Sequence, residues 1–375
     1  MKPARIDLLT STRFFLAAIV IAFHGAFYLD NAGVTTNPVV YNLVHNGYLA
    51  VQFFFVLSGF ILTYTYFGAD PDGLWIRFAA ARLARIYPVY LVGLLAMLPF
   101  ALRPGYLEPS ANEPFPVVAG LQLALLQAWI PKHALSWNAP GWSLSAEVFF
   151  YALFPLLLSR IRRIPSTALV LSALAICVLQ QGGDWALGKF VSQVYATGNT
   201  PLFRLPEFVV GMIAGIICLR HRTVLRTAAP WLAPIAMAIC GLGFAAPGID
   251  ALQLNNGELS LPAAMLCIGL AARPDAMAFL ANGHLVRLGQ ASYAMYILHY
   301  PLSLWLARAT RSLGFGASFP GAYFLVYFAM VVFISVLVYV AIEEPMRSAI
   351  KRRLRAAGDA KGAFAEREAI ADPAP

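Results

Sequence analysis

The sequence predicts an all-α polytopic membrane protein with about ten transmembrane helices and one short or re-entrant helix. Of its 375 residues, 60% are hydrophobic and only 12% are charged, whereas soluble domains carry about 25% charged residues. The mean hydropathy is +0.69, and long apolar runs recur along the whole chain. A membrane β-barrel would show short segments of alternating polarity instead, so we expect helices throughout.

Apolar segments that could form these helices follow one another from the N-terminus to the C-terminus. They cover approximately residues 13–29, 47–67, 86–102, 117–131, 146–159, 166–181, 203–220, 230–247, 259–272, 289–307 and 321–343. A helix needs about 20 apolar residues to span a bilayer. Segment 117–131 is short and is bounded by Pro116 and Pro131, which makes it the weakest candidate for a span.

The arginine content of the loops predicts the topology. Clusters of Arg follow the second, fifth, seventh, ninth and last segments, and the positive-inside rule makes such loops cytoplasmic. Three segments lie between Arg85 and Arg160, so one of them should not cross. We assign that role to 117–131, which leaves ten spans with both termini in the cytoplasm.

The domain organisation is simple. Residues 1–350 form one transmembrane domain, and residues 351–375, basic and then rich in Ala and acidic residues, are expected to be a disordered cytoplasmic tail. The net charge of +9 follows from the cytoplasmic loops and does not indicate nucleic-acid binding. The four cysteines stand singly in apolar stretches and are expected to pack rather than bind metal. We expect no metal site and no bound cofactor.

The first apolar segment carries two chemically unusual residues, Arg13 and His24. Eleven helical residues separate them, which brings them to within roughly 20° of one face and about 16 Å apart along the axis. This spacing places His24 near the middle of the bilayer, where an ionisable side chain indicates a functional site. The alternative is a neutral histidine that shares its proton with a neighbouring helix.

A pair of arginines precedes the third segment. Arg82 and Arg85 share a helix face and can grip one anion together, and Arg77 lies nearby. We expect Pro88 in the first turn of the following span, where free N–H groups also favour an anion. The cluster suits a phosphorylated ligand, although ordinary positive-inside topology explains such a cluster equally well.

Further polar residues lie inside apolar segments. Glu147 and Tyr151 stand one turn apart, and a carboxylate at this depth needs a partner such as His24 or an arginine. Gln52 is another polar group that needs a partner. For the tryptophans Trp137 and Trp142, a role as interfacial anchors alone is an alternative to a role in the site.

The tenth segment places Ser292, Tyr296 and His299 on one helical face. Pro301 lies just beyond His299 and should free a backbone carbonyl and kink the helix. Near the end of the chain, Glu344 and Arg347 can form a structural pair.

These side chains suit acyl transfer from a phosphate-bearing donor. A histidine can take a hydroxyl proton near neutral pH, and a carboxylate can fix its tautomer. No Gly-x-Ser-x-Gly elbow and no suitably placed cysteine is found, so direct attack on a thioester is favoured over an acyl-enzyme. From the residues alone, a proton-coupled transporter is a comparable reading.

Six of these motifs, taken in order from about residue 6 to residue 347, resemble the acyltransferase 3 family of integral membrane O-acyltransferases. The motifs are Arg-x10-His, the run Gly47–Phe60, Arg-x-x-Arg, Trp142–Glu147, Ser292–Leu302 and Glu-Pro-x-Arg. Two positions depart from the family pattern. Ala50 replaces the usual Gly, and Gln52 replaces the common Asp, which removes a buried charge.

The resemblance implies an enzyme of the bacterial inner membrane that moves an acyl group, usually acetyl, from cytoplasmic acyl-CoA to a glycan hydroxyl. Carried over by position, Arg13 and His24 are essential, His24 acts as general base, and Glu147 supports the site. Arg82 and Arg85 would meet the CoA phosphates. Some relatives append a periplasmic SGNH hydrolase-like domain, and we expect this chain to be a stand-alone member.

Two other functions remain possible at this point. One is a proton-coupled permease or flippase for a polysaccharide or lipid intermediate, with His24, Glu147 and His299 as a proton relay. The absence of a clear internal repeat weighs against it. The other is a non-catalytic family member that acts as an assembly partner, which only Gln52 favours.

Overall fold

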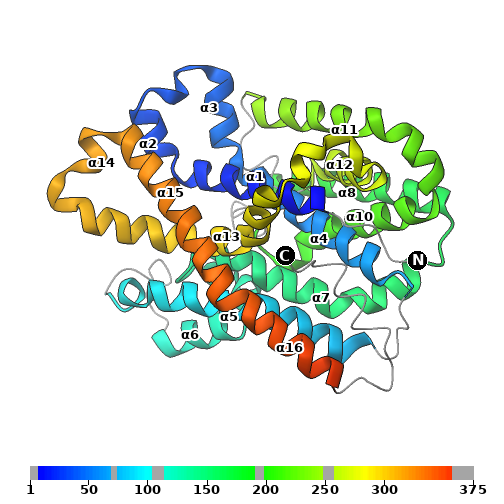
Figure 1. The fold of residues 1–375 in the computed structure, drawn as a ribbon, viewed down its shortest axis with the longest axis horizontal. Coiled ribbons are helices and arrows are strands. Elements are labelled where there is room, and N and C mark those ends of the chain that lie inside the picture. Colours follow the sequence, from blue (N-terminus) through cyan, green and yellow to red (C-terminus); the bar gives the residue numbers. More distant parts are fainter. Residues whose placement is uncertain (1–6, 69–73, 104–113, 191–197, 248–256, 357–375) are drawn as a thin grey trace.

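The computed structural model describes residues 7–68, 74–103, 114–190, 198–247 and 257–356. Within these ranges the chain is helical and contains no strand. The long helices are α1 (Asp7–His24), α4 (Ala50–Tyr66), α5 (Leu74–Ala101), α7 (Trp142–Ile161), α8 (Ser166–Phe190), α10 (Pro201–Arg220), α11 (Arg222–Ala245), α12 (Ser260–Ala272), α13 (Gly283–Thr310) and α15 (Pro320–Val338). They pack into one bundle (Figure 1).

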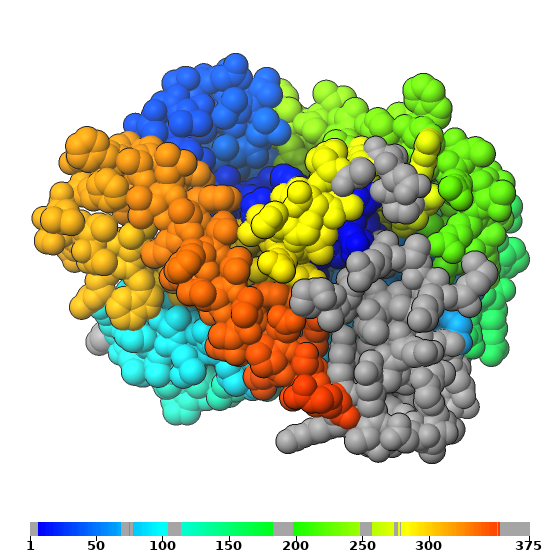
Figure 2. Space-filling model, in the orientation of Figure 1, coloured from blue at the N-terminus to red at the C-terminus, as the bar shows by residue number. Residues whose placement is uncertain are grey.

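Shorter elements connect the long helices. They are α2 (Ala26–Asn31), α3 (Pro38–His45), α6 (Phe115–Leu123), α14 (Phe315–Ser318) and α16 (Glu344–Ala356), together with 3-10 turns and a π-helical turn at Tyr339–Glu343. Through that turn α15 continues into α16, and Figure 2 shows the two as one ridge on the face in view. Helix α16 reaches Ala356, six residues into the predicted tail, and residues 357–375 lie outside the described ranges.

The all-α membrane fold is confirmed. Seven helices of the described chain are long and apolar enough to cross a membrane, and Ser166–Gly182 and Ser260–Ala272 are shorter apolar helices. With the 28-residue α13, each of the ten predicted spans coincides with a helix. Segment 117–131 instead folds into the nine-residue α6 followed by 3-10 turns.

Arginines from three separate parts of the chain gather at one end of the bundle, which we call the arginine end. There, Arg82 bonds the Tyr66 hydroxyl, Arg162 the carbonyl of Phe67, and Arg222 the Tyr64 hydroxyl. All three acceptors lie in the last turn of α4 or directly after it. The opposite end holds His24 and the start of α4, and we call it the histidine end.

Helices α1 and α13 run in parallel towards the histidine end. Near their beginnings, a Cβ on Gly289 would overlap the backbone of Thr10, and at the other end the rings of His24 and His299 are in contact. The close approach at Gly289 therefore brings the two helices together and places their histidines side by side.

Two sequence predictions about helix ends are wrong. The segment expected at 13–29 breaks at Gly25, and α1 ends at His24. The ring of Phe324 packs against Gly25 and leaves no room for a Cβ there. Helix α5 begins at Leu74 and runs through Pro88, rather than restarting there. A proline inside a helix removes one hydrogen bond, and in a membrane bundle neighbouring groups can bond the backbone carbonyl that is left free.

Candidate functional site

A cavity of about 50 Å³ with many polar lining residues opens among five helices towards the arginine end. Its polar lining residues are Arg13 of α1, Ser58 of α4, Arg82 and Arg85 of α5, and Glu147, Tyr151 and Tyr293 of α7 and α13. We call it the arginine cavity. Three guanidinium groups and one carboxylate give it a net positive lining suited to an anionic ligand.

A second cavity, also of about 50 Å³, lies next to the first. Both are lined by Arg13, Phe54, Glu147 and Tyr293, and the second adds Ser143, Ser292 and Tyr296. We call it the tyrosine cavity. Because the two cavities share four lining residues, they lie side by side in the bundle.

A pair of histidines lies close to Tyr296 of the tyrosine cavity. The Tyr296 ring lies 6.0 Å from that of His299, and the His299 ring lies 4.6 Å from that of His24, measured between ring centroids. His299 is completely buried, whereas the side chain of His24 is exposed. The expectation of a His24 side chain buried inside an apolar segment is therefore corrected, and His24 is the last residue of α1.

The hydrogen bonds of the two rings define their tautomers. His24 Nδ1 lies 2.9 Å from the Val20 carbonyl, and His299 Nδ1 lies 2.7 Å from the Tyr296 carbonyl. Because a carbonyl oxygen can only accept, each Nδ1 carries the proton and each Nε2 presents a lone pair. Nε2 of His299 is buried and has no hydrogen-bond partner among the described residues, so it is available to accept a proton.

A strained loop holds α13 in place at this end. Trp137 adopts a left-handed backbone conformation, with φ of 62°, and its indole nitrogen donates to the Leu94 carbonyl. The next residue, Asn138, donates to the carbonyl of Ile297 at 3.2 Å. Because Pro301 has no N–H to bond it, the Ile297 carbonyl is the free carbonyl predicted from the sequence, and Asn138 donates a hydrogen bond to it. Strain of this kind is typical of functional sites.

Trp137 and Trp142 pack inside the bundle. They are 6% and 9% exposed, so they do not act as interfacial anchors. Trp142 lies beneath the guanidinium of Arg204, with 5.4 Å between the Arg204 Cζ atom and the ring centroid.

Arg82 differs from the other arginines at the same end of the bundle. It is 4% exposed and stacks near the rings of Tyr66 and Phe78 while it lines the arginine cavity. Arg162 and Arg220, by contrast, donate to loop carbonyls, as expected for structural residues. The side chain of Arg77 lies outside the described residues.

The predicted site residues thus divide into three groups. Arg13, Arg82, Arg85, Glu147 and Tyr151 line the arginine cavity. Ser292 and Tyr296 line the tyrosine cavity, and the pair of His24 and His299 lies close to Tyr296. The sequence predicted His24 or an arginine as the partner of Glu147. Glu147 lines the same cavities as arginines, whereas His24 contacts the ring of His299.

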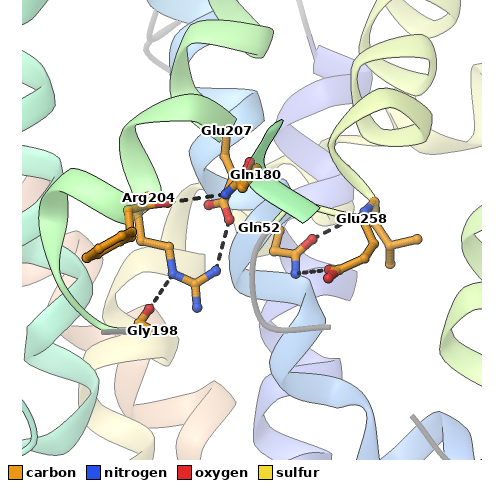
Figure 3. A network of polar contacts seen from close by, with 8 residues as sticks. Gln52, Gln180, Gly198, Arg204, Glu207 and Glu258 are labelled. Atoms are coloured by element: carbon orange, nitrogen blue, oxygen red, sulfur yellow. Dashed lines mark hydrogen bonds and ion pairs between the residues drawn. The ribbon is translucent and has the colours of Figure 1, made fainter. Parts of the chain in front are cut away.

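Gln52 belongs to a separate polar network (Figure 3). Its side-chain amide donates to the Glu258 carboxylate at 3.1 Å and accepts from the Leu259 backbone at 3.3 Å. Burial raises the pKa of the Glu258 carboxyl. The amide therefore ties α4 to the start of α12, and a carboxylate does lie beside position 52, supplied by another part of the chain.

Figure 3 also shows a buried ion pair whose two residues are not among the predicted site residues. Arg204 Nη1 lies 2.9 Å from Glu207 Oε1, and Arg204 Nε donates to the Gly198 carbonyl. The i, i+3 spacing of Arg204 and Glu207 in the sequence could have predicted this ion pair. No local signal exists for Glu258, because its partner Gln52 lies 206 residues away in the sequence.

An apolar groove of about 410 Å³ lies on the other side of α4. Residues of α1, α4, α11, α12 and the turn Pro274–Ala281 line it, among them Leu16, Phe53, Leu57, Cys240 and Leu270. Its walls are almost entirely hydrophobic, so it suits an alkyl chain. In the described part of the chain, no cluster of three or more His, Cys, Asp or Glu residues could hold a metal ion.

Comparison with known proteins gives a consistent result. The acyltransferase domain of the Acyl_transf_3 family matches residues 6–340. The chain is 29% identical over 380 residues to the acyltransferase MdmB of Streptomyces mycarofaciens, and the match covers 94% of each of the two chains. It is 30% identical over 309 residues to the exopolysaccharide production protein ExoZ of Rhizobium meliloti (strain 1021), covering 80% of this chain and 89% of ExoZ.

A more distant relative is longer than this chain. The O-acetyltransferase OatA of Staphylococcus aureus (strain NCTC 8325 / PS 47) is 24% identical over 301 residues, which are 72% of this chain and 48% of OatA. No solved structure matches the chain.

Proposed function

The chain belongs to the acyltransferase 3 family, and from that premise we propose that it is a membrane O-acyltransferase that uses cytoplasmic acyl-CoA. The acyl group, acetyl in the simplest case, passes to a hydroxyl of a glycan such as exopolysaccharide or lipopolysaccharide. The protein works in the bacterial inner membrane with both termini in the cytoplasm.

One observation carries the proposal. Two adjacent cavities, which we take as one path, lie between an arginine pair at one end of the bundle and a histidine pair near the other. Arg13 lines both cavities of this path, and eleven helical residues, or about 16 Å, separate it from His24. An extended pantetheine arm can bridge a gap of this size between bound phosphates and a reacting thioester.

The arginine end suits the phosphates of CoA. Arg82 and Arg85 lie in one cavity, and guanidinium groups bind phosphate oxygens through two parallel hydrogen bonds. The other arginines of this end support a cytoplasmic orientation. Arg13 sits farther along the path beside Glu147, where it can hold the pantetheine arm.

His24 acts as general base. Its Nδ1–H is held by Val20, so Nε2 can take the proton of an acceptor hydroxyl that arrives from the exposed side. The acceptor oxygen forms a bond to the acyl carbon, the carbon–sulfur bond breaks, and the proton ends on the CoA thiol. His299 lies in ring contact with His24, and it can share the proton before the thiolate leaves.

The acceptor assignment comes from the relatives. ExoZ is an exopolysaccharide production protein and OatA is an O-acetyltransferase, and together they favour an O-linked acyl group on a glycan. The exposure of His24 also supports a large acceptor, because a polymer cannot enter a closed cavity.

The test uses purified protein in nanodiscs, acetyl-CoA, and exopolysaccharide from the host lacking this protein. We expect thiol release together with new O-acetyl resonances in the NMR spectrum of the glycan. His24→Ala should lower the rate by at least about a hundredfold, which is typical for loss of a general base.

His221→Ala is the matched control. His221 is an exposed histidine at the arginine end, bonded to Ser166, and it lies outside the path, so its variant should keep the wild-type rate. Equal ester content with wild-type protein and with His24→Ala would refute the assignment of His24. Transport of a glycan without any acyl-CoA requirement would refute the enzyme.

A further inference from the structure

Ser292 of α13 carries a buried hydroxyl that bonds no described residue. Its side chain is 0% exposed, and its Oγ has no hydrogen-bond partner in the described part of the chain. A serine inside a helix commonly bonds a carbonyl one turn earlier, as Ser159 and Ser303 do in this protein. Because a buried hydroxyl without a partner costs free energy, Ser292 is available to a ligand.

The tyrosine cavity gives a ligand access to this hydroxyl. Among the described serines and threonines, Ser292 alone combines a buried, unbonded hydroxyl with a place in the lining of the two cavities or the groove. The hydroxyls of Ser143 and Tyr293, which also line the tyrosine cavity, already donate to backbone carbonyls. The cavity volume of about 50 Å³ has room for a polar group of a few atoms, since one water needs about 10–15 Å³.

The rest of the lining indicates the kind of ligand. Val51, Phe54, Phe55 and Leu144 add apolar surface to the cavity that Ser292 lines. Pantetheine, the arm of CoA, joins methylene groups through two amides, so it needs apolar walls and a few hydrogen-bond partners. A hydroxyl can serve either side of an amide, because it donates to the carbonyl and accepts from the N–H.

The position along α13 assigns Ser292 to the arm of the donor rather than to the reacting carbon. Ser292 precedes His299 by seven residues, or about 10.5 Å along the helix axis. Arg13, which lines the same cavity, is separated from His24 by eleven residues in the same direction. A group bonded to Ser292 therefore lies short of the histidine pair.

The inference rests on the proposed function: we propose that Ser292 binds an amide of the pantetheine arm and so holds the thioester towards the histidine pair. Ser292 forms no covalent bond in this role. The bonds made and broken stay those of the transfer described above.

The test is Ser292→Ala in nanodiscs, with two probes that separate the halves of CoA. One is the KM for acetyl-CoA, and the other is the inhibition constant of 3′,5′-ADP, which has phosphates but no amide. We expect KM to rise about fivefold, as for the loss of one hydrogen bond, and the inhibition constant to stay at the wild-type value. The melting temperature should not fall, because the hydroxyl bonds no described residue.

Ser335→Ala is the matched control. Ser335 of α15 is also 0% exposed, its Oγ bonds no described residue, and it lies outside the linings of the two cavities and the groove. Both of its constants should match the wild type. An unchanged KM for Ser292→Ala, as expected if only water occupies the site, would overturn the role of Ser292. An equal rise of KM and of the inhibition constant would overturn it too, because it would indicate a general distortion.

Failure of this inference differs from failure of the proposed function. An active wild type together with a wild-type KM for Ser292→Ala would overturn the role of Ser292 and leave the acyltransferase intact. A wild type that releases no thiol from acetyl-CoA would overturn the proposed function, and this inference with it.

Discussion

Arg82 combines three properties that no other described arginine of its end combines. It is buried, it lies near two aromatic rings at 5.9 and 5.8 Å, and it faces a cavity. Contact with a ring contributes about 0.5–2 kcal/mol and holds the planar guanidinium ready for a phosphate. A lysine at the same position would be a point charge without that orientation.

We therefore expect Arg82→Lys to raise KM for acetyl-CoA about tenfold and to change kcat less. The measurement is steady-state thiol release in nanodiscs. Arg162→Lys serves as control because Arg162 donates to the Phe67 carbonyl outside the cavity, and its KM should match the wild type. An unchanged KM for Arg82→Lys would exclude Arg82 from donor binding.

Among the helices, α4 has the central position. It carries residues of both cavities, of the apolar groove and of the Gln52–Glu258 link. It packs so closely on α10 that a Cβ on Gly59 would overlap the Phe208 carbonyl, and one on Gly211 would overlap the Val56 carbonyl. Small residues allow this approach in a membrane, where packing rather than water drives helix association.

Replacing Gly211 by Ala should therefore push α10 away from α4 and lower the melting temperature by several degrees. The measurement is thermal unfolding in detergent followed by size exclusion. Gly241→Ala on α11 is the control, because a Cβ there meets open space and alanine favours a helix over glycine. Equal melting temperatures for both variants would contradict the importance of this contact.

For the whole molecule, the bundle has two chemically different ends. Arginines from separate parts of the chain meet at one end, and the histidine pair lies at the other. If the arginine end faces the cytoplasm, donor and acceptor approach from opposite sides of the membrane. The acyl group then travels inside the bundle while CoA stays on its own side.

Cysteine labelling in intact cells tests this orientation. In a variant without the native cysteines, Leu313→Cys at the histidine end should react with an impermeant maleimide added outside. Leu313 is 74% exposed in the loop between α13 and α14. Arg163→Cys, in the exposed loop after α7, should react only after permeabilisation, and the opposite pattern would reverse the topology.

Local patterns in the sequence were enough to predict several features of this protein. Composition predicted the all-α membrane fold, and helical periodicity put Arg13 and His24 on one helix. Loop charge predicted that one of three segments does not cross, and its short length between two prolines identified 117–131 as that segment, which forms no long helix. The missing N–H of Pro301 predicted a free carbonyl. Each of these features depends on residues that are close together in the sequence, so the sequence alone is enough to predict it.

The tertiary structure alone decided which residues meet. His24 contacts His299, and Gln52 bonds Glu258. Asn138 donates a hydrogen bond to the carbonyl of Ile297, which lies 159 residues away in the sequence. Ser292 looks like any helical serine until the structure shows that its hydroxyl bonds no described residue and lines a cavity. Such contacts depend on how distant helices pack, and helical periodicity reports only one helix at a time.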